Sequence, residues 1–365
     1  MAKASTFAVT ATDIASRRIL RLALGTTLSM GFSQLINWPL SFMAAIITMF
    51  ILALPLPALT LKNGFKFSIA LVLPAYAGML LVPFLIHARW AGILMIILAF
   101  FGSFYYTARG GSPVIGMFMT VGLTLVVAVG SVSAELLLIL VNGLAVGALV
   151  GVTFVVIAHA LLPDLPMPAS AAVAKPTPPA KPSPAFARRN ALRSLVVVLP
   201  LVIFFLFSSS SVFYIAIMIK VASMGQQANA QVSRSMGREQ LESTFWGGLG
   251  AIIAYQIIII WPVLPMFCLL IAIACLFYGS RIFQGVGMHP RAAMWSYALL
   301  TMIIILTPAV TGSGDAAGAF YTRLMLFIII AIYGTISVAV FDAFWPQPAA
   351  PNHSNQNFNI QIEKT

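Results

Sequence analysis

Two ionisable side chains stand at matching places in apolar stretches of the chain. His159 lies in VVIAHALLP and Asp342 in VAVFDAFWP, each four residues before a proline. Ionisable groups are costly to bury in lipid and often mark proton pathways, so both are candidates for binding and releasing protons. The alternative is that both lie at the membrane interface and are hydrated. Asp315, in TGSGDAAG, is a third candidate for proton coupling.

Four arginines and one amide are candidates for an anion pathway. Arg21, Arg193 and Arg281 fall at the ends of apolar stretches, where they would form a basic vestibule or serve topology and lipid headgroup contact. Arg323 follows Asp315, and would attract an anion or pair with a nearby carboxylate. Gln256 would contact substrate or form a bond between helices.

Aromatic and small residues give further patterns. Phe100 and Tyr278 belong to aromatic groups that could stack on a ring of the substrate or pack in the core. Gly143, Gly147 and Gly151 recur every four residues, a spacing typical of close helix packing.

Enzyme signatures are scarce. We find no HExxH, no Walker A loop and no GxSxG elbow, and the two cysteines, Cys268 and Cys275, share one apolar stretch. We therefore expect no catalysis, no metal and no cofactor.

The composition requires a membrane. The 365 residues are 61% hydrophobic and 8% charged, whereas a soluble domain carries about 25% charged residues. Long unbroken apolar runs favour helices over a β-barrel. We predict an all-α polytopic protein with about twelve spans, at 19–36, 39–59, 67–86, 91–107, 114–131, 136–161, 192–208, 211–223, 244–261, 263–280, 292–309 and 321–344.

Basic residues give the chain its orientation. With the N-terminus inside, 18 of the 20 Lys and Arg, Lys220 among them, fall on the cytoplasmic side, and only Arg89 and Arg323 fall outside. Basic residues concentrate in cytoplasmic loops, so both termini should be cytoplasmic. The net charge of +12 has the same origin, and we expect no nucleic-acid partner.

The chain divides into two similar halves. Residues 163–187 are rich in Pro and Ala and read as a cytoplasmic linker between six-helix repeats at 1–162 and 188–345, with a disordered tail at 346–365. Each half opens with clustered arginines. The FFGS at 100–103 matches the FYGS at 277–280, and near the ends of the halves His159 pairs with Asp342. Six spans are an even number, so the repeats should be parallel, related by an axis along the membrane normal.

Residues 20–55, and especially 21–27 (RLALGTT) and 37–40 (NWPL), resemble the fusaric-acid-resistance and aromatic-acid-exporter (FUSC) superfamily, and within it the compact membrane proteins of the DUF2955 group. The resemblance implies a bacterial inner-membrane efflux component driven by the proton gradient. It also implies a periplasmic adaptor of the membrane-fusion type and an outer-membrane channel.

The function predicted from charge placement and resemblance is secondary export of small organic anions such as aromatic carboxylates. A major-facilitator transporter would carry an acidic residue in the loop between spans two and three, and PALTLKNGFKF has none. Two alternatives stay open, a passive anion channel and a non-transporting subunit that anchors an efflux complex.

Overall fold

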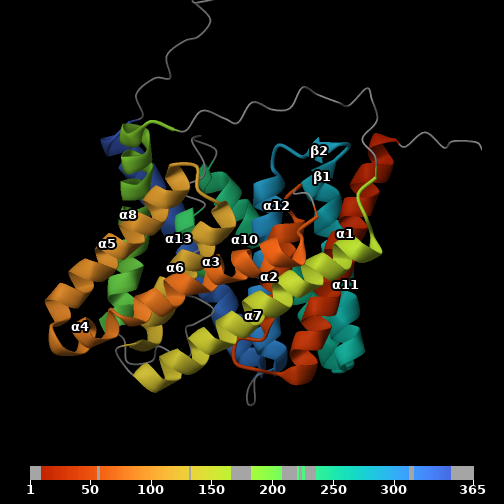
Figure 1. Ribbon diagram of the computed structural model, residues 1–365, viewed down its shortest axis with the longest axis horizontal. Coiled ribbons are helices and arrows are strands. Elements are labelled where there is room, and N and C mark those ends of the chain that lie inside the picture. Colours follow the sequence, from red (N-terminus) through yellow and green to blue (C-terminus); the bar gives the residue numbers. More distant parts are fainter. Residues whose placement is uncertain are drawn as a thin grey trace, which may run out of the picture.

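The computed structural model describes residues 10–55, 58–130, 133–165, 182–207, 220–221, 224–226, 236–311 and 316–346. Almost all of this is helix (Figure 1). The elements of the first half are α1 (Ala11–Ile36), α2 (Phe42–Leu52), α3 (Leu61–Met79), α4 (Val82–His87), α5 (Arg89–Ala108), α6 (Pro113–Leu125), the π-helix η1 (Val126–Gly130) and α7 (Ala134–Leu161).

The described part of the second half is also mainly helical. Its elements are α8 (Pro184–Phe207), α10 (Met236–Ile260), α11 (Leu264–Ile282), the strands β1 (Phe283–Gln284) and β2 (Gly287–Met288), α12 (Ala292–Thr311) and α13 (Ala316–Phe344). The two strands form one antiparallel hairpin, with Phe283 opposite Met288. Since α8 begins at Pro184, the last residues of the expected linker are helical.

Local sequence explains where the helices begin and end. Thr10 caps α1, accepting a hydrogen bond from the Asp13 backbone while the Asp13 carboxylate accepts one from the Thr10 backbone. The helix ends at Asn37, which has a left-handed φ of 52°. The stretch expected as one span at 67–86 is broken at residues 80 and 81 into α3 and α4.

Eight helical segments of the described chain are long and apolar enough to cross a membrane. Most of the twelve expected spans coincide with helices, but the described residues do not confirm a count of twelve. The stretch expected at 39–59 contains only α2, whose eleven residues extend about 16 Å against a hydrocarbon core of about 30 Å. The span expected at 211–223 lies almost wholly outside the described residues.

Burial explains why α2 can be so short. Ten of its eleven side chains are buried, and α2 packs against α1, α7 and α12. Its apolar run is therefore matched to a protein interior rather than to lipid. The glycines of α7 make this packing possible, since a Cβ on Gly143 would overlap the Pro39 carbonyl oxygen and one on Gly151 would lie 2.7 Å from that of Ala44. The prediction of a close-packing glycine face is confirmed.

Helices from the two halves pack against each other in corresponding pairs. Helix α1 packs against α11 of the second half, and α8 packs against α5 of the first. Within the halves, α3 packs against α6 and α7, while α10 packs against α12 and α13.

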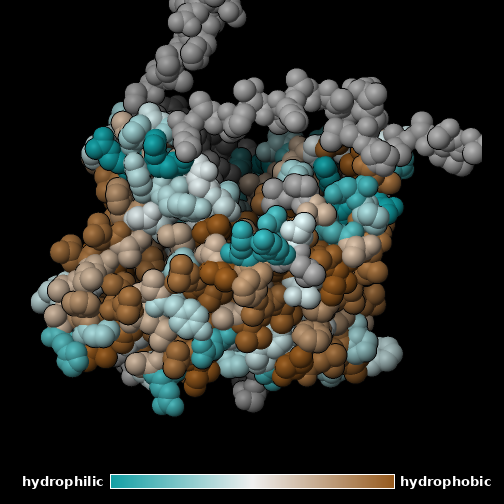
Figure 2. Space-filling view, in the orientation of Figure 1, coloured by the Kyte–Doolittle hydropathy of each residue, from teal (hydrophilic) through white to brown (hydrophobic). Residues whose placement is uncertain are grey.

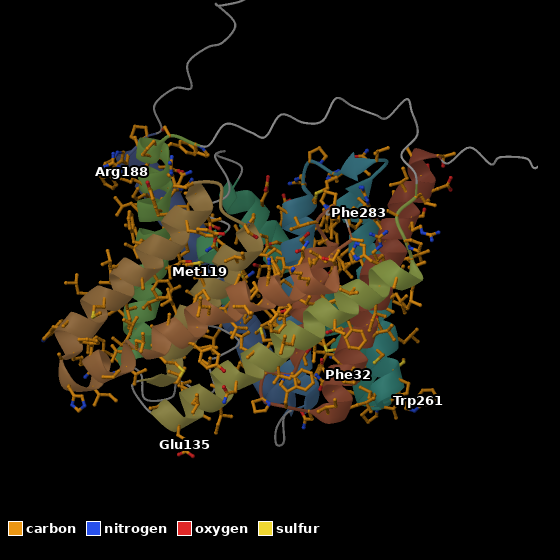
Figure 3. The ribbon with its side chains drawn as sticks, viewed as in Figure 1. Phe32, Met119, Glu135, Arg188, Trp261 and Phe283 are labelled. Carbon is orange, nitrogen blue, oxygen red and sulfur yellow. The ribbon has the colours of Figure 1, made fainter. Side chains whose placement is uncertain are left out.

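The surface is apolar between two ends. Figure 2 shows hydrophobic side chains over most of the visible face, with hydrophilic groups gathered towards both ends and in a smaller central patch. Figure 3 shows Arg188 and Phe283 at one end, and Phe32, Glu135 and Trp261 at the other. We call the end with Arg188 the basic end. Large apolar side chains such as Trp90 and Ile260 are more than 80% exposed, as lipid-facing residues are.

Candidate functional site

At the basic end, Arg21 joins α1 to the residues that follow α7. Its Nε donates to the Leu162 carbonyl at 3.1 Å, and its Nη2 lies 2.6 Å from the carboxylate of Asp164. Arg17 donates to the Pro163 carbonyl at 2.7 Å. These contacts join α1 to the chain that follows α7, and we call them the arginine clasp of the first half. Arg21 is buried, so it is part of this clasp and does not line an open vestibule.

The second half has an equivalent clasp. Arg189 Nε donates to the Trp345 carbonyl at 3.2 Å, and Nη2 of the same residue lies 3.0 Å from Asp342 Oδ1. Arg193 Nη2 lies 2.7 Å from Asp342 Oδ2. Leu162 and Trp345 each directly precede a proline, so the two clasps use corresponding positions. The sequence did not predict that Asp342 lies between two arginines.

His159 and Asp342 have different surroundings. His159 is buried in the last turns of α7, and its Nδ1 donates to the Val155 carbonyl at 2.9 Å. That bond keeps a proton on Nδ1, so the ring would exchange protons at Nε2. The Asp342 side chain is 32% exposed and bridges two cations. Asp342 therefore joins α13 to two arginines of α8, whereas the Nδ1 hydrogen bond of His159 is to its own helix.

A fully buried cation, Lys220, was not among the residues that the sequence singled out. Its exposed fraction is 0%, and Nζ donates to Thr301 Oγ1 in α12 at 3.0 Å. Nζ also lies 5.8 Å from the centre of the Phe327 ring in α13. A signal was present, because Lys220 interrupts the apolar run YIAIMIKVAS, but span counting put it at a cytoplasmic end.

The helical residues that follow Lys220 reach into the first half. Gln226 is buried, and its Nε2 donates to the Gly116 carbonyl at 3.0 Å and to Thr120 Oγ1 at 2.8 Å. Thr120 in turn shares a hydrogen bond of 3.0 Å with Ser103. Between them, Lys220 and Gln226 contact α12 and α13 of one half and α6 of the other. Gln226, Thr120 and Ser103 thus form a connected set of buried polar groups between the two halves.

The aromatic candidates lie in packed clusters. Phe100 is fully buried and stacks on Phe104 at 6.2 Å between ring centres. The Tyr278 hydroxyl donates to the Trp246 carbonyl at 2.8 Å. Arg281 lies over the Trp295 ring at 5.7 Å, on an exposed part of α11.

Two amide side chains, those of the candidate Gln256 and of Asn142, join helices. Gln256 donates to the Tyr321 hydroxyl at 3.0 Å, between α10 and α13. The Tyr76 hydroxyl donates to Asn142 Oδ1 at 2.5 Å, between α3 and α7. Asp315 lies outside the described residues, as does the side chain of Arg323.

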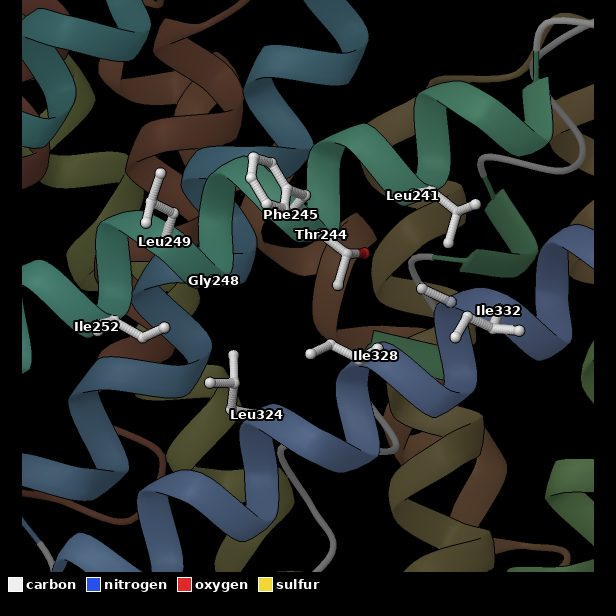
Figure 4. Close-up of a pocket in the computed structure, with 10 residues that line it drawn as sticks. Leu241, Thr244, Phe245, Gly248, Leu249, Ile252, Leu324, Ile328 and Ile332 are labelled. Carbon is white, nitrogen blue, oxygen red and sulfur yellow. The ribbon is translucent and has the colours of Figure 1, made fainter.

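Two grooves lie between helices that pack in corresponding pairs. One, of about 410 Å³, separates α10 from α13, and Figure 4 shows side chains of both helices facing across it. The other, of about 290 Å³, separates α3 from α7. The lining is almost entirely apolar in both, with Thr244 in the first and Ser68 in the second. Within the described residues, no three His, Cys, Asp or Glu side chains are grouped to hold a metal ion.

Each residue that lines the smaller groove has a counterpart in the lining of the larger one, which also includes Leu324 and Ala331. One constant offset in the numbering relates the α3 positions to α10 positions, and a second constant offset relates the α7 positions to α13 positions. The pairs are Phe65 and Leu241, Ser68 and Thr244, Ile69 and Phe245, Val72 and Gly248, Leu73 and Leu249, Tyr76 and Ile252, Ala145 and Ile328, and Leu149 and Ile332.

The long apolar helices define the chain as a multi-pass helical membrane protein. A family model described as a protein of unknown function (DUF2955) matches residues 18–158. The match runs from α1 into α7 and so covers most of the expected first repeat. No curated protein and no solved structure matches the chain.

Proposed function

We propose that this protein is a secondary exporter of small organic anions, such as aromatic carboxylates, in the bacterial inner membrane. The observation that carries the proposal is Lys220, a lysine with no exposed surface in an apolar membrane protein. Charged side chains within a membrane are expensive, and those that occur commonly serve ion or substrate pathways. A lysine is suited to bind a carboxylate as a compact charge with three donors.

The surroundings of Lys220 fit an organic anion. Thr301 supplies a hydroxyl beside the ammonium. This hydroxyl donates to the Tyr297 carbonyl at 2.9 Å and would turn from it to donate to a carboxylate oxygen. The Phe327 ring supplies an apolar surface next to the charge. A carboxylate with an attached ring matches that combination of one cation, one hydroxyl and one aromatic face.

We further propose that the chain is two parallel six-helix repeats. The corresponding clasps, helix pairs and grooves support this, and the offset that relates the α7 and α13 groove positions is the same as that between His159 and Asp342. In parallel-repeat transporters the substrate site lies between the repeats, and the two halves rock about it. Gln226 of the second half donates to Gly116 and Thr120 of the first, as a residue between two repeats would, and Lys220 precedes it by six residues.

The remaining parts of the proposal rest on the sequence. The excess of basic residues supports cytoplasmic termini, so organic anions would be collected at the basic end. His159 is the candidate for proton coupling. A periplasmic adaptor of the membrane-fusion type and an outer-membrane channel would complete the route out of the cell, and the chain itself would be no enzyme.

The test is transport by the purified full-length protein in liposomes that contain a pH-sensitive dye. Hydroxybenzoates and fusaric acid would be added in turn, with labelled acid followed in parallel. We expect flux of one acid coupled to proton movement, at least tenfold lower in Lys220→Gln. Lys175→Gln, a lysine of the Pro- and Ala-rich segment, is the matched control and should transport normally.

The outcomes separate the alternatives. Anion current without proton flux would identify a passive channel. Export by cells that needs this chain, but survives substitution of Lys220 and His159, would identify an assembly subunit. Unchanged coupled flux in Lys220→Gln would remove Lys220 from the pathway.

A further inference from the structure

The groove between α3 and α7 continues into two lysines. Its lining on α3 follows the helical spacing of Phe65, Ile69 and Tyr76, and Lys62 and Lys66 extend that same face towards the start of the helix. Both lysine side chains are exposed. The apolar groove therefore has a charge of +2 beside its end at the start of α3.

The groove is open to the surroundings of the protein. Phe65, Ile69 and Leu73 along its edge are each about half exposed or more. In a membrane protein such a face is in contact with acyl chains. At its far end, the Tyr76–Asn142 hydrogen bond joins the two walls.

The corresponding groove between α10 and α13 differs in charge. Under the offset that pairs the α3 and α10 linings, the counterparts of Lys62 and Lys66 are Arg238 and Glu242, whose charges sum to zero. Glu242 also lies 2.5 Å from Nη2 of Arg291. At these positions the sequence thus has two basic residues beside the first groove, and one basic and one acidic residue beside the second.

We propose that the groove between α3 and α7 binds an anionic phospholipid. One acyl chain lies along Phe65, Ile69 and Leu73, and the headgroup phosphate lies at Lys62 and Lys66. The apolar lining takes up the chain, and the two ammonium groups select the negative headgroup. The groove between α10 and α13 takes an acyl chain without selecting the headgroup. The proposal does not depend on transport.

The experiment uses full-length protein in nanodiscs of phosphatidylcholine with a minor share of photoreactive lipid. The probe is phosphatidylglycerol or phosphatidylcholine with a diazirine in one acyl chain, and crosslinked peptides are identified by mass spectrometry. We expect phosphatidylglycerol to be favoured at the first groove, by up to about thirtyfold for two lysines near the headgroup. At the second groove both probes should crosslink alike.

Matched variants locate the lipid. Lys62→Gln with Lys66→Gln should reduce the preference at the first groove to that of the second. Leu73→Trp should block crosslinking at the first groove only, and its counterpart Leu249→Trp should block it at the second only. Circular dichroism and size-exclusion profiles verify that each variant is folded.

Three results would overturn the proposal. Equal labelling of the first groove by both lipids would show that the lysines do not select the headgroup. If the preference for phosphatidylglycerol persists in the Leu73→Trp variant, the lipid must bind outside the first groove. Absence of lipid at the first groove, with disulfide crosslinking between copies of Leu73→Cys, would show that a second copy of the chain occupies it.

Discussion

Arg193 lies 2.7 Å from Asp342, and its side chain is 1% exposed. The same carboxylate also accepts from Arg189 at 3.0 Å, so one acidic group in α13 fixes two arginines of α8. The pair joins the first described helix of the second half to its last. In the first half Arg21 and Asp164 make the corresponding contact, with Asp164 48% exposed.

The first prediction follows from the difference in exposure between the side chains of Asp342 and Asp164. Asp342→Ala removes the carboxylate of a buried ion pair, which commonly costs about 3–5 kcal/mol, and we expect about 2–4 kcal/mol because Asp342 is partly solvated. Asp164→Ala should cost about 1 kcal/mol or less. Thermal unfolding in detergent, followed by tryptophan fluorescence, should give a lower Tm for Asp342→Ala. Equal Tm values for the two variants would contradict a structural role for the Asp342 pair.

The second prediction separates stability from function at Lys220. Lys220→Met replaces a buried charge by an apolar side chain of similar length, and such replacements are often neutral or stabilising by about 1–4 kcal/mol. We expect an unchanged or higher Tm together with loss of anion flux. Thr301→Val, which removes the acceptor of Lys220, should lower the Tm. A Lys220→Met protein that is much less stable would identify the lysine as structural.

The third prediction concerns the contact of α7 with the segment that joins α1 to α2. Gly143→Ala places a Cβ closer to the Pro39 carbonyl oxygen than the 3.0 Å that real Cβ atoms keep, so α7 and this segment must move apart. We expect a loss of about 1–3 kcal/mol, seen as a lower Tm. Gly102→Ala is the control, because no atom lies within 4 Å of its added Cβ. That substitution should be neutral or stabilising by up to about 1 kcal/mol through helix propensity.

The fourth prediction measures the Tyr76–Asn142 hydrogen bond. Tyr76→Phe, Asn142→Leu and the double variant form a cycle whose coupling energy we expect to be about 0.6 kcal/mol, with an upper bound of about 1.7 kcal/mol. Unfolding free energies in mixed micelles would supply the four values. Additive effects would mean that the bond contributes nothing to joining α3 with α7.

The sequence predicted the helical membrane class because composition and run length determine it directly. It predicted the glycine face of α7 as well, since four-residue spacing is a local pattern. The length of α2 could not be predicted in this way. An apolar run has the same composition whether lipid or protein covers it, and α2 is covered by protein.

The candidate site was predicted only in part. Asp342 and His159 stood out as ionisable groups in apolar runs, but the surroundings of Asp342 depend on arginines of a distant helix and those of His159 on its local backbone. Lys220 was overlooked because a hydropathy pattern does not show whether a residue near the end of an apolar run lies inside the protein or at its surface. Its neighbours Thr301 and Phe327 come from two later helices.

The carbonyls held by Arg21 and Arg189 lie at the C-terminal ends of α7 and α13, where the aligned peptide dipoles carry about half a negative charge. Much of the positive charge of these arginines is thus compensated by the helix ends and carboxylates that they contact. Lys62 and Lys66 stand instead in the first turns of α3, which contain no acidic residue and carry the positive end of a dipole. A negatively charged molecule approaching the protein would therefore be drawn more strongly to the start of α3 than to the arginine clasps.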